Sequence, residues 1–425
     1  MAKQVKVGLL GLGTVGRSVL DLLVANRAVI QDGAGVPVQL VAACDIKAKT
    51  KRIKGVPVVK DALKVINDPS IDIIVEAIGG VKPALNYILK ALASGKHVVT
   101  SNKEVIAKYM PTIFAAAKKN KVLVLYEAAV GGGVPIIQAI RDNLAANHIN
   151  EIYGIVNGTT NYILDSMTKK DVEFADALKD AQARGFAEAN PAADVEGYDA
   201  AYKAAILAAT AYGAYVDCNK VHREGITKIR QEDIQYAKET GYVIKLIATA
   251  RKWTGNKLDV RVHPVFVHNT HPLAKVSENY NAIFVKGDYV GQVMFHGEGA
   301  GGKPTASAVV SDIIKIARGG AYRVLSQAYP KQKAVLCDIN QIERRYYFNL
   351  KVPDRSGVLA VISKAFAKNN VSIQAVTQRE TVGKIATLII VTHAVSGDNI
   401  QATLRDLAKL SVVKKISNVV RVGLY

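Results

Sequence analysis

Residues 5–30 read VKVGLLGLGTVGRSVLDLLVANRAVI, and this stretch decides the fold of the first part of the chain. It begins with an apolar run typical of a buried strand, passes through three glycines spaced as GxGxxG, and continues with apolar residues at helical spacing. In this context the first glycine allows a tight turn, the second leaves room for a pyrophosphate and the third lets the helix pack closely. The N–H groups at the start of the helix then face the phosphates. The stretch therefore predicts a dinucleotide-binding βαβ unit.

A second strand, predicted over 39–44, ends at Asp45, where such folds place the acidic residue that binds the adenosine ribose. An acid at this position favours the free 2′-hydroxyl of NAD. The basic run KAKTKRIK, residues 47–54, favours the 2′-phosphate of NADP instead. The two signals conflict, so both nucleotides stay open. Asp45 follows Gly16 by 29 residues, which predicts a long loop over residues 31–37.

Strands and helices go on alternating up to residue 126. Apolar runs predict strands over 71–77, 97–100 and 122–126, and amphipathic segments predict helices over 83–94 and 104–120. This alternation predicts a doubly wound parallel sheet of the Rossmann type. We assign this NAD(P)-binding domain to residues 1–133, completed by a return segment over 303–325.

The composition narrows the range of partners. The 425 residues carry a net charge of +20, but aromatic residues make up only 6% and the basic residues are scattered, so nucleic acid is not the expected partner. Apolar runs fall short of the roughly 20 residues that a membrane helix needs, and the N-terminus lacks the apolar core of an export signal. Three separated cysteines form neither a disulfide framework nor a metal cluster. We expect a cytoplasmic protein without a nucleic-acid or membrane partner.

The stretch EANPAADVEGYDAAYKAAILAAT, residues 188–210, is where we expect the chemistry. A loop carrying Glu188 and Asp194 precedes a helix in which Asp199 and Lys203 stand four residues apart and share one face. The residues that follow are almost wholly apolar, so this helix should be buried. Burial removes water from the lysine ammonium, and a neighbouring carboxylate then tunes it for proton transfer. The alternative is an ordinary Asp/Lys pair on a surface helix, which the spacing alone also allows.

Four polar or glycine-rich turns stand at strand ends or helix starts, where ligands of such sheets bind. TSNKE (100–104) directs Lys103 at the cofactor crevice, and NGTTN (157–161) offers hydrogen bonds to a polar ligand or forms an N-capped turn. EAAVGGGVP (127–135) is either a hinge between domains, a simple linker, or a site whose carbonyls hold a cation or ligand. GEGAGGKPTAS (297–307) is a second glycine-rich helix start, before a helix predicted over 308–318.

The rest of the chain predicts two further units. Strands over 260–266, 282–285 and 291–295 indicate an α+β catalytic domain with a mixed sheet, assigned to residues 134–302 together with substrate binding and dimerisation. From residue 346 to the end, the order βαββαβ predicts a ferredoxin-like sandwich with one open sheet face, assigned to 346–425. An open face is most easily buried by pairing with a second copy, so we expect a homodimer or homotetramer.

The motifs GLGTVG, TSNKE, EAAVGGGVPII, NGTTNYIL, GYDAAYKAAILA and GEGAGGKPTASAVVSDI stand in the order and approximate spacing of the homoserine dehydrogenases, over about the first 320 residues. The chain resembles this family, which implies NAD(P)-dependent, reversible reduction of L-aspartate 4-semialdehyde to L-homoserine in threonine, methionine and isoleucine biosynthesis. The physical roles agree with that activity. Hydride transfer to an aldehyde places negative charge on its oxygen, which a lysine ammonium can stabilise and protonate.

Carried over position by position, the resemblance implies a role for each matched residue. Lys203 and Lys103 handle the hydroxyl proton, and Asp199 positions the first of them. Glu188 holds the substrate ammonium, and further substrate contacts come from Lys103, Asp194, Lys203, Asn157, Gly158 and Thr159. Cofactor contacts come from Gly11, Leu12, Gly13, Thr14, Val15, Gly16, Asp45, Ile78, Lys103, Gly299 and Gly301. A monovalent cation such as Na+ is held by the loop of Glu127, Val130, Gly132 and Val134, mostly through backbone oxygens.

The segment VPDRSGVLAVISKAFAKNNVSIQAV, residues 352–376, resembles the ACT regulatory domain, which binds an amino acid where two copies meet. Ser356 stands where that family usually has proline. The resemblance implies an amino-acid effector, with threonine as the candidate. Two other functions stay open: another Rossmann dehydrogenase acting on an amino-acid semialdehyde, and a non-enzymatic sensor of nucleotide and amino acid.

Overall fold

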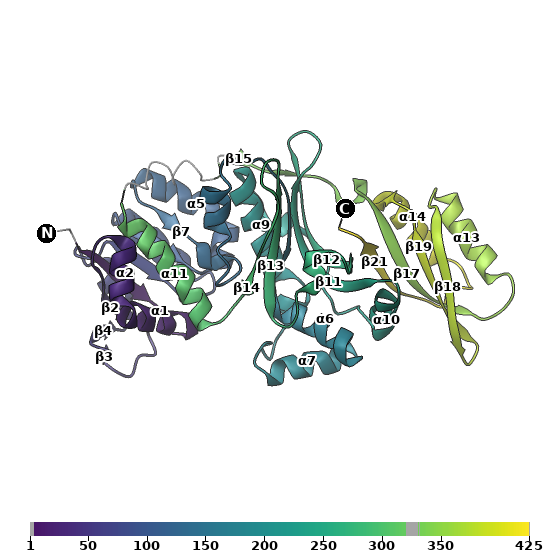
Figure 1. Cartoon of the computed structure of the whole chain (residues 1–425), viewed down its shortest axis with the longest axis horizontal. Helices are drawn as coiled ribbons and strands as arrows, with labels where there is room; N and C mark the ends of the chain where they lie inside the picture. The colour runs from purple at the N-terminus through teal and green to yellow at the C-terminus, as the bar shows by residue number, and fades with distance from the viewer. Residues whose placement is uncertain (1–3, 320–329, 331, 425) are drawn as a thin grey trace.

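The first unit is built around β1 (Val5–Leu10), which lies in a seven-stranded sheet of order β3-β4-β2-β1-β5-β6-β7. The computed structural model describes residues 4–319, 330 and 332–424, and Figure 1 shows this sheet at one end of an elongated molecule. Every pair is parallel except that of β3 with β4. The other strands are β2 (Val38–Cys44), β3 (Arg52–Ile53), β4 (Val56–Val59), β5 (Ile73–Glu76), β6 (His97–Thr100) and β7 (Val124–Leu125). The predicted Rossmann-type sheet is confirmed.

Helices cover both faces of this sheet, because parallel strands are apolar on both sides. One face packs against α1 (Thr14–Ala25), α2 (Arg27–Ala34) and the returning α11 (Gly302–Ala317). The other packs against α3 (Ala62–Ile66), α4 (Ala84–Ala93) and α5 (Lys103–Lys119). Figure 1 shows α11 lying beside α1, although the two are far apart in the sequence. Residues 320–325 of the predicted return segment lie outside the described residues.

Two predictions about this unit are wrong. The first four residues of the loop expected over 31–37 belong to helix α2, which ends at Ala34 and is followed by Gly35, a residue with φ of 72°. The return helix begins at Gly302 rather than at residue 308, because Pro304 fits the first helical turn, where its missing N–H has no partner to lose. In both cases glycine or proline marked a helix end rather than a loop.

The central unit contains five long strands in the order β14-β13-β8-β11-β12, and each neighbouring pair is antiparallel. The short strands β10 (His222–Arg223) and β16 (Val335–Leu336) pair with β12 in parallel, so the sheet is mixed as predicted. The long strands are β8 (Ile149–Ile155), β11 (Tyr242–Lys252), β12 (Lys257–His268), β13 (Tyr280–Gly287) and β14 (Gly291–Glu298). Strand β11 is not among the predicted elements, since Lys245 and Arg251 interrupt its apolar run.

Helix α9 (Tyr198–Tyr212) lies at the centre of the molecule, between this sheet and α5. Every residue from Ala204 to Ala209 is buried, so the surface-helix alternative is wrong. The other helices of the unit are α6 (Gly158–Lys170), α7 (Phe174–Ala183), α8 (Ala192–Val195) and α10 (Gln231–Glu239). Short elements are η1 (Glu127–Ala129), η2 (Ala139–Asn143), η3 (Cys218–Lys220), η4 (Pro272–Lys275), η5 (Ile339–Gln341) and the strand pair β9 (Ala214–Tyr215) and β15 (Gln332–Lys333). Within the described ranges, no helix is long and apolar enough to cross a membrane.

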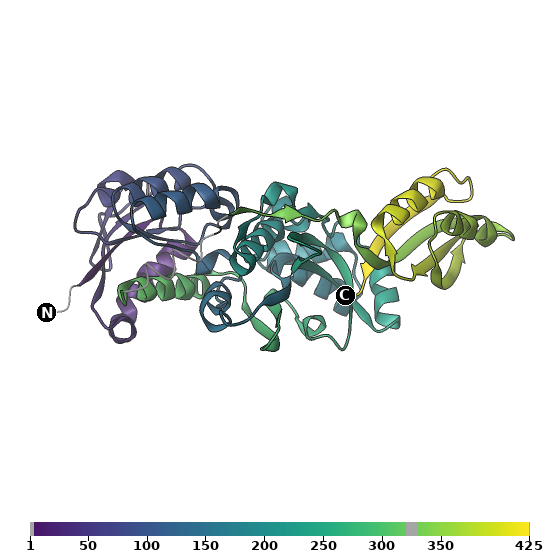
Figure 2. The same cartoon turned by 90° about the horizontal axis from the view of Figure 1, so that it is seen from above.

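The last unit has the predicted βαββαβ order, and its sheet has the strand order β21-β17-β19-β18 with antiparallel pairs. The helices α13 and α14 cover one face of the sheet, which Figure 2 shows from above. The elements are β17 (Glu343–Pro353), α13 (Val358–Lys368), β18 (Ile373–Val382), β19 (Ile385–Thr392), β20 (Val395–Ser396), α14 (Gly397–Leu407) and β21 (Lys415–Val422).

Part of the second face of that sheet, which we expected a second copy to bury, is covered by the same chain. Helix α10 of the same chain packs there, and its buried Asp233 accepts hydrogen bonds from Tyr347 Oη (2.8 Å), Asn349 Nδ2 (3.0 Å) and Asn418 Nδ2 (2.7 Å). In addition, β21 pairs with β12 through Phe266 and Val422, so the two sheets are continuous. The C-terminal unit is therefore in direct contact with the central unit of its own chain.

Candidate active site

The three glycines of the first turn differ in the space around them. A Cβ on Gly11 would lie 2.6 Å from Ala77 O, and one on Gly16 would lie 1.9 Å from Gly11 O. Gly13, in contrast, has no neighbour within 4 Å of such a Cβ. The close contacts hold the turn against the end of β5, and the open position leaves room for a pyrophosphate at the N-terminus of α1. These residues fit a dinucleotide.

Asp45 lies at the end of β2 beside this turn. Its Oδ2 accepts from Leu12 N (2.8 Å) and its Oδ1 from Lys47 N (2.7 Å), so the carboxylate also supports the glycine turn. It lines two cavities, one of about 310 Å³ with the apolar Ile78 and one of about 570 Å³ with basic side chains. The basic residues of the second cavity are Arg17, Lys47, Lys49 and Arg52. Arg17 is not among the residues predicted for this site.

Glu76, another residue that was not predicted, holds the turn after β5 against the end of β6. It is fully buried at the end of β5, where Oε1 accepts from Ile78 N (2.8 Å) and Oε2 from Thr100 Oγ1 (2.6 Å). The signal in the sequence was an acidic residue ending an otherwise apolar strand. It ties Ile78 to the turn that precedes Lys103.

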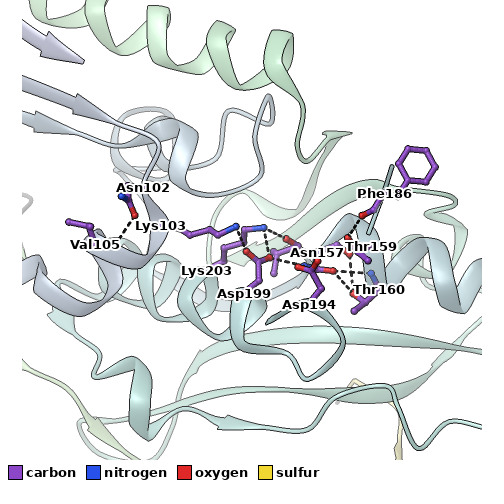
Figure 3. A network of polar contacts seen from close by, with 11 residues as sticks. Asn102, Lys103, Val105, Asn157, Thr159, Thr160, Phe186, Asp194, Asp199 and Lys203 are labelled. Carbon is purple, nitrogen blue, oxygen red and sulfur yellow. Dashed lines mark hydrogen bonds and ion pairs between the residues drawn. The ribbon is translucent and has the colours of Figure 1, made fainter. Parts of the chain in front are cut away.

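Two of the three residues predicted for catalysis, Lys103 and Lys203, line one cavity of about 480 Å³, while Asp199 is not part of its lining. The cavity lies where the start of α5, the loop after β7, the loop before α11 and helix α9 come together. Its lining includes Lys103, Glu188, Lys203, Gly132, Gly299 and Gly301. Figure 3 shows Lys103 and Lys203 reaching Asp199 from two different elements.

Asp199 stands between two lysines. Lys203 Nζ lies 2.7 Å from Asp199 Oδ2 and donates also to Val156 O (2.6 Å), while Lys103 Nζ pairs with Asp199 Oδ1. The helical spacing brings Lys203 over Asp199, and the N-cap residue Asn102 starts α5 so that Lys103 points the same way. Asp199 and Lys203 are buried, whereas Lys103 is partly exposed.

The pKa values follow from this arrangement. Burial alone would raise the pKa of Asp199, but the charges of Lys203 and Lys103 outweigh it and the pKa is lowered. Burial lowers the pKa of Lys203, against the opposing effect of Asp199. The negative charge of Asp199 raises the pKa of Lys103. The pKa of Asp194 is also raised, mainly by burial and to a smaller extent by the charge of Asp199. The cluster thus holds one ammonium that burial has made a stronger acid.

Asn157 joins the two carboxylates. Its Nδ2 donates to Asp194 Oδ1 (2.7 Å) and Asp199 Oδ2 (2.8 Å), while its Oδ1 accepts from Thr160 N (2.9 Å) and so caps α6. The amide is therefore satisfied within the protein (Figure 3). This geometry supports a positioning role for Asn157.

Two other residues predicted to touch substrate have contacts inside the protein. Thr159 Oγ1 donates to Phe186 O (2.6 Å), which holds the loop that leads to Glu188. A Cβ on Gly158 would lie 2.5 Å from Asn279 O, so this glycine permits the close approach of that segment. Both support the walls of the site.

The loop predicted to hold a cation is a glycine turn next to a buried carboxylate. Gly131 and Gly132 have φ of 73° and 56°, and the Glu127 carboxylate accepts from the backbone N–H of residues 137 (2.8 Å) and 138 (2.7 Å). Within the described part of the chain no three His, Cys, Asp or Glu side chains group around a metal position. The buried Asn281 amide, packed against Gly299, has no hydrogen-bond partner among the described residues. A cation at this loop therefore stays a prediction, and it would need backbone carbonyls as ligands because both Glu127 oxygens already accept N–H groups.

Comparison with known proteins gives family matches along the chain. Residues 11–127 match the model of the homoserine dehydrogenase NAD-binding domain, residues 135–314 that of homoserine dehydrogenase, and residues 346–412 that of the ACT domain. Homoserine dehydrogenases of Neisseria gonorrhoeae and Synechocystis are 40% and 42% identical, over 99% and 98% of this chain and 98% and 99% of theirs.

Solved structures agree with these matches. A homoserine dehydrogenase from Thiobacillus denitrificans aligns with a TM-score of 0.91 at 39% identity, covering 99% of this chain and 98% of its own. A hyperthermophilic archaeal homoserine dehydrogenase mutant in complex with NADPH aligns with a TM-score of 0.63 at 27% identity, over 74% of this chain and 97% of its own.

Proposed function

The chain belongs to the homoserine dehydrogenase family, and from this premise we propose how its own residues carry out the reaction. The family activity is the NAD(P)-dependent interconversion of L-aspartate 4-semialdehyde and L-homoserine, a step of amino-acid biosynthesis. When bound, the nicotinamide supplies or accepts the hydride. The protein must then bind the substrate, exclude water and move one proton at the substrate oxygen.

Lys203 is the residue that we assign to this proton. In the direction of reduction its ammonium donates a proton to the oxygen as negative charge develops there, and in the reverse direction the neutral amine accepts it. The observation that carries this assignment is the pair of contacts to Asp199 (2.7 Å) and Val156 O (2.6 Å) at the wall of the cavity. These contacts leave one N–H of the ammonium for the substrate.

Lys103 and Asp199 complete the catalytic group. Lys103 enters the cavity from the cofactor side, and its charge adds to the stabilisation of the substrate oxygen. Asp199 holds both lysines and, since its own pKa is lowered, stays ionised throughout. It acts through the two lysines as a positioning residue.

Glu188 and Asp194 are the residues that we assign to the substrate's amino acid end. Glu188 lines the same cavity as the two lysines, and its carboxylate is the type of group that pairs with an ammonium. Asp194 is held by Asn157 and lies beside Asp199. Gly158 and Thr159 support this wall through their contacts to neighbouring segments.

For the nucleotide we propose that both NADP and NAD are accepted. The cavity with Arg17, Lys47, Lys49 and Arg52 favours a 2′-phosphate, while Asp45 favours a free ribose hydroxyl. The test is the ratio of kcat/KM for NADPH to that for NADH. Asp45→Ser should raise this ratio and Arg17→Ala should lower it. If neither substitution changes the ratio, this cavity does not bind the nucleotide.

Four further assignments are part of the proposal. The loop of Glu127, Val130, Gly132 and Val134 would hold a monovalent cation through backbone oxygens. The chain acts as a homodimer or homotetramer in the cytoplasm, and an amino acid such as threonine regulates it through the ACT domain, a domain type that suggests a small-molecule effector.

The other functions considered have less support. A semialdehyde dehydrogenase with a covalent thiohemiacetal would need a reactive thiolate. Burial instead raises the pKa of Cys44 and of Cys337 to about 11 each. A sensor without catalysis would have no use for two lysines converging on one carboxylate.

The test of the catalytic group uses two lysines of the same helix. Lys103→Ala should lower kcat by at least about tenfold, because it removes one cation from the developing oxyanion. Lys108→Ala is the matched control, since Lys108 pairs with Glu104 (2.6 Å) instead of Asp199 and should leave kcat near wild type. Equal effects of the two substitutions would contradict the assignment.

A further inference from the structure

The turn after β5, residues 77–80, forms part of the wall of two cavities. Ile78 lines the cavity of about 310 Å³ at the end of β2, whereas Gly79 and Gly80 line the catalytic cavity together with Lys103. Both glycines have positive φ, 84° and 66°, a conformation that other residues rarely adopt. One short turn therefore borders both the proposed nucleotide space and the space next to the lysines.

Glu76 holds this turn to the neighbouring strand. The side chain is fully buried, and its Oε1 accepts from Ile78 N (2.8 Å) while its Oε2 accepts from Thr100 Oγ1 (2.6 Å). Glu76 and Thr100 are register partners at the ends of β5 and β6. A buried carboxylate is costly without such donors, so both contacts are needed to keep it there. The carboxylate therefore connects the turn after β5 to the end of β6.

Asn102 closes this connection from the other side. Its Nδ2 donates to Gly80 O (2.7 Å), its backbone N–H donates to Thr100 Oγ1 (3.0 Å), and its Oδ1 accepts from Val105 N (3.1 Å). The same amide thus caps α5 and cross-links the two turns. Together with the contacts of Glu76, these bonds form a closed ring that includes the turn after β5 and the start of α5.

The ring fixes the backbone from which Lys103 starts. Lys103 is the first residue of α5, and Figure 3 shows Asn102 at the N-terminus of this helix with the Lys103 side chain directed to Asp199. Lys103 is partly exposed, so packing restrains it less than it restrains the buried Lys203. A long side chain has many rotamers, and its ammonium stays in one place only if the backbone at its base is held.

We propose that Asn102 and Glu76 are positioning residues, whose ring of hydrogen bonds holds Lys103 in register with the turn 77–80. The ammonium that stabilises the substrate oxygen and the wall of the nucleotide space then keep one geometry. Both residues act through Lys103 rather than on the reacting atoms. The effect on turnover rests on the proposed role of Lys103, whereas the placement of its side chain does not.

Asn102→Ser separates the cross-link from the helix cap. Serine is as good an N-cap residue as asparagine, so α5 should still begin at the same place. Its side chain is one bond shorter and cannot reach Gly80 O while it caps the helix. We expect kcat to fall by about threefold or more, because a small misplacement of a charged group is costly to the reaction. The KM for the nucleotide should stay within about twofold, since Glu76 still holds the turn.

A double-mutant cycle with Lys103→Ala separates positioning from a general structural role. If Asn102 acts through Lys103, Asn102→Ser should cause no further loss of kcat once the lysine side chain is absent. If the two losses of kcat multiply, Asn102 acts elsewhere and the proposal is overturned.

The placement of Lys103 is measured without catalysis by the rate of reductive methylation at each lysine, followed by peptide mass spectrometry. The charge of Asp199 raises the pKa of Lys103, so little of the reactive neutral amine is present. In Asn102→Ser the ion pair should loosen, and Lys103 should be labelled at least about threefold faster, as a fall of about half a pKa unit would give. Lys108, on the same helix and paired with Glu104 (2.6 Å), is the internal control and should keep its rate. An unchanged rate at Lys103, or an equal rise at Lys108, would overturn the proposal.

A matched pair of variants at Thr100 tests the Glu76 side of the ring. Thr100→Val removes the hydroxyl at nearly the same side-chain volume, whereas Thr100→Ser keeps the hydroxyl. Thr100→Val should speed the labelling of Lys103 and lower kcat, and Thr100→Ser should lie closer to wild type in both. Equal behaviour of the two variants would overturn the part assigned to Glu76.

The two readouts also separate this inference from the proposed function. If Lys103→Ala keeps the turnover of wild type while Asn102→Ser still speeds the labelling of Lys103, the placement is supported and the catalytic role of Lys103 is wrong. If Lys103→Ala lowers kcat while Asn102→Ser changes neither kcat nor labelling, the catalytic role is supported and the positioning role of Asn102 is wrong.

Discussion

Lys203 and Lys245 are both buried lysines of the central unit, and each ammonium donates to one main-chain carbonyl and one side-chain oxygen. Lys203 donates to Val156 O (2.6 Å) and Asp199 Oδ2 (2.7 Å), and Lys245 donates to Val276 O (2.6 Å) and Asn161 Oδ1 (2.9 Å). Burial lowers the pKa of both. They differ in the side-chain oxygen, which carries a negative charge in Asp199 and none in Asn161.

We propose that this difference separates a lysine that transfers a proton from a structural one. Lys203 faces a cavity and has a counter-charge that opposes the effect of burial on its pKa. Lys245 connects strand β11 to the segment after η4 through Asn161. Its ammonium donates to Asn161 Oδ1, and Asn161 Nδ2 donates to Glu278 O (2.9 Å). On this proposal, burial by itself does not make a proton donor, and a counter-charge and a position at the cavity are also needed.

The largest expected effect comes from removing Lys203, the lysine that we assign to proton transfer. Lys203→Ala should lower kcat by about 10²-fold or more, the usual contribution of a general acid, with nucleotide affinity near wild type. Steady-state kinetics and nucleotide titration measure the two quantities. Unchanged turnover would show that Lys203 does not transfer the proton and that it does not differ from Lys245 in function.

Removing the counter-charge should turn Lys203 into a lysine like Lys245. In Asp199→Asn the pKa of Lys203 should fall further, because the carboxylate that raises it is gone. The ammonium is then lost at lower pH, so the alkaline limb of the pH profile for reduction should move to lower pH, and kcat at pH 8 should fall by at least about tenfold. An unmoved limb would show that Asp199 does not set the protonation of Lys203.

The structural lysine should affect stability and leave turnover alone. The pKa of Lys245 falls from 10.5 to about 8 on folding, so the unfolded state binds more protons between these values and stability rises with pH across that window. At about 1.4 kcal/mol per pKa unit, wild type should gain about 3 kcal/mol of unfolding free energy relative to Lys245→Met between pH 8 and 10.5.

Denaturant unfolding of the two proteins at several pH values measures this difference, and other titrating groups cancel in the comparison. The kcat of Lys245→Met should stay within about threefold of wild type, far from the 10² of a missing general acid. A constant difference in stability across the pH range would mean that Lys245 keeps an ordinary pKa when folded.

The sequence predicted those parts of the fold that depend on local pattern. The glycine turn at Gly11, the apolar strands of the Rossmann-type sheet and the apolar run after Lys203 each have a periodic signature. Strand β11 has none, because Lys245 is buried inside it by partners that lie 84 and 31 residues away. The charge of Lys245 predicts an exposed side chain, and only the contacts with distant residues explain why it is buried.

The site could be predicted as a set of residues but not as a geometry. Spacing of four residues joined Asp199 to Lys203, yet nothing local joins either to Lys103 on α5. The roles of Asn157 and Glu76 also depend on partners distant in the sequence, at 37 to 42 residues for Asn157 and 24 for the Thr100 contact of Glu76. The covered face of the ACT sheet was missed for the same reason, since Asp233 precedes Tyr347 by 114 residues.

The central claim, that the Lys203 ammonium is the proton donor, is tested most directly by chemical rescue of Lys203→Ala. Methylammonium and ethylammonium can enter the space left by the side chain and supply the missing proton. We predict that they restore kcat in proportion to their concentration, with the stronger acid giving the faster rate, and that wild type and Lys245→Met do not respond. No recovery at any amine concentration, with nucleotide affinity intact, would contradict the claim.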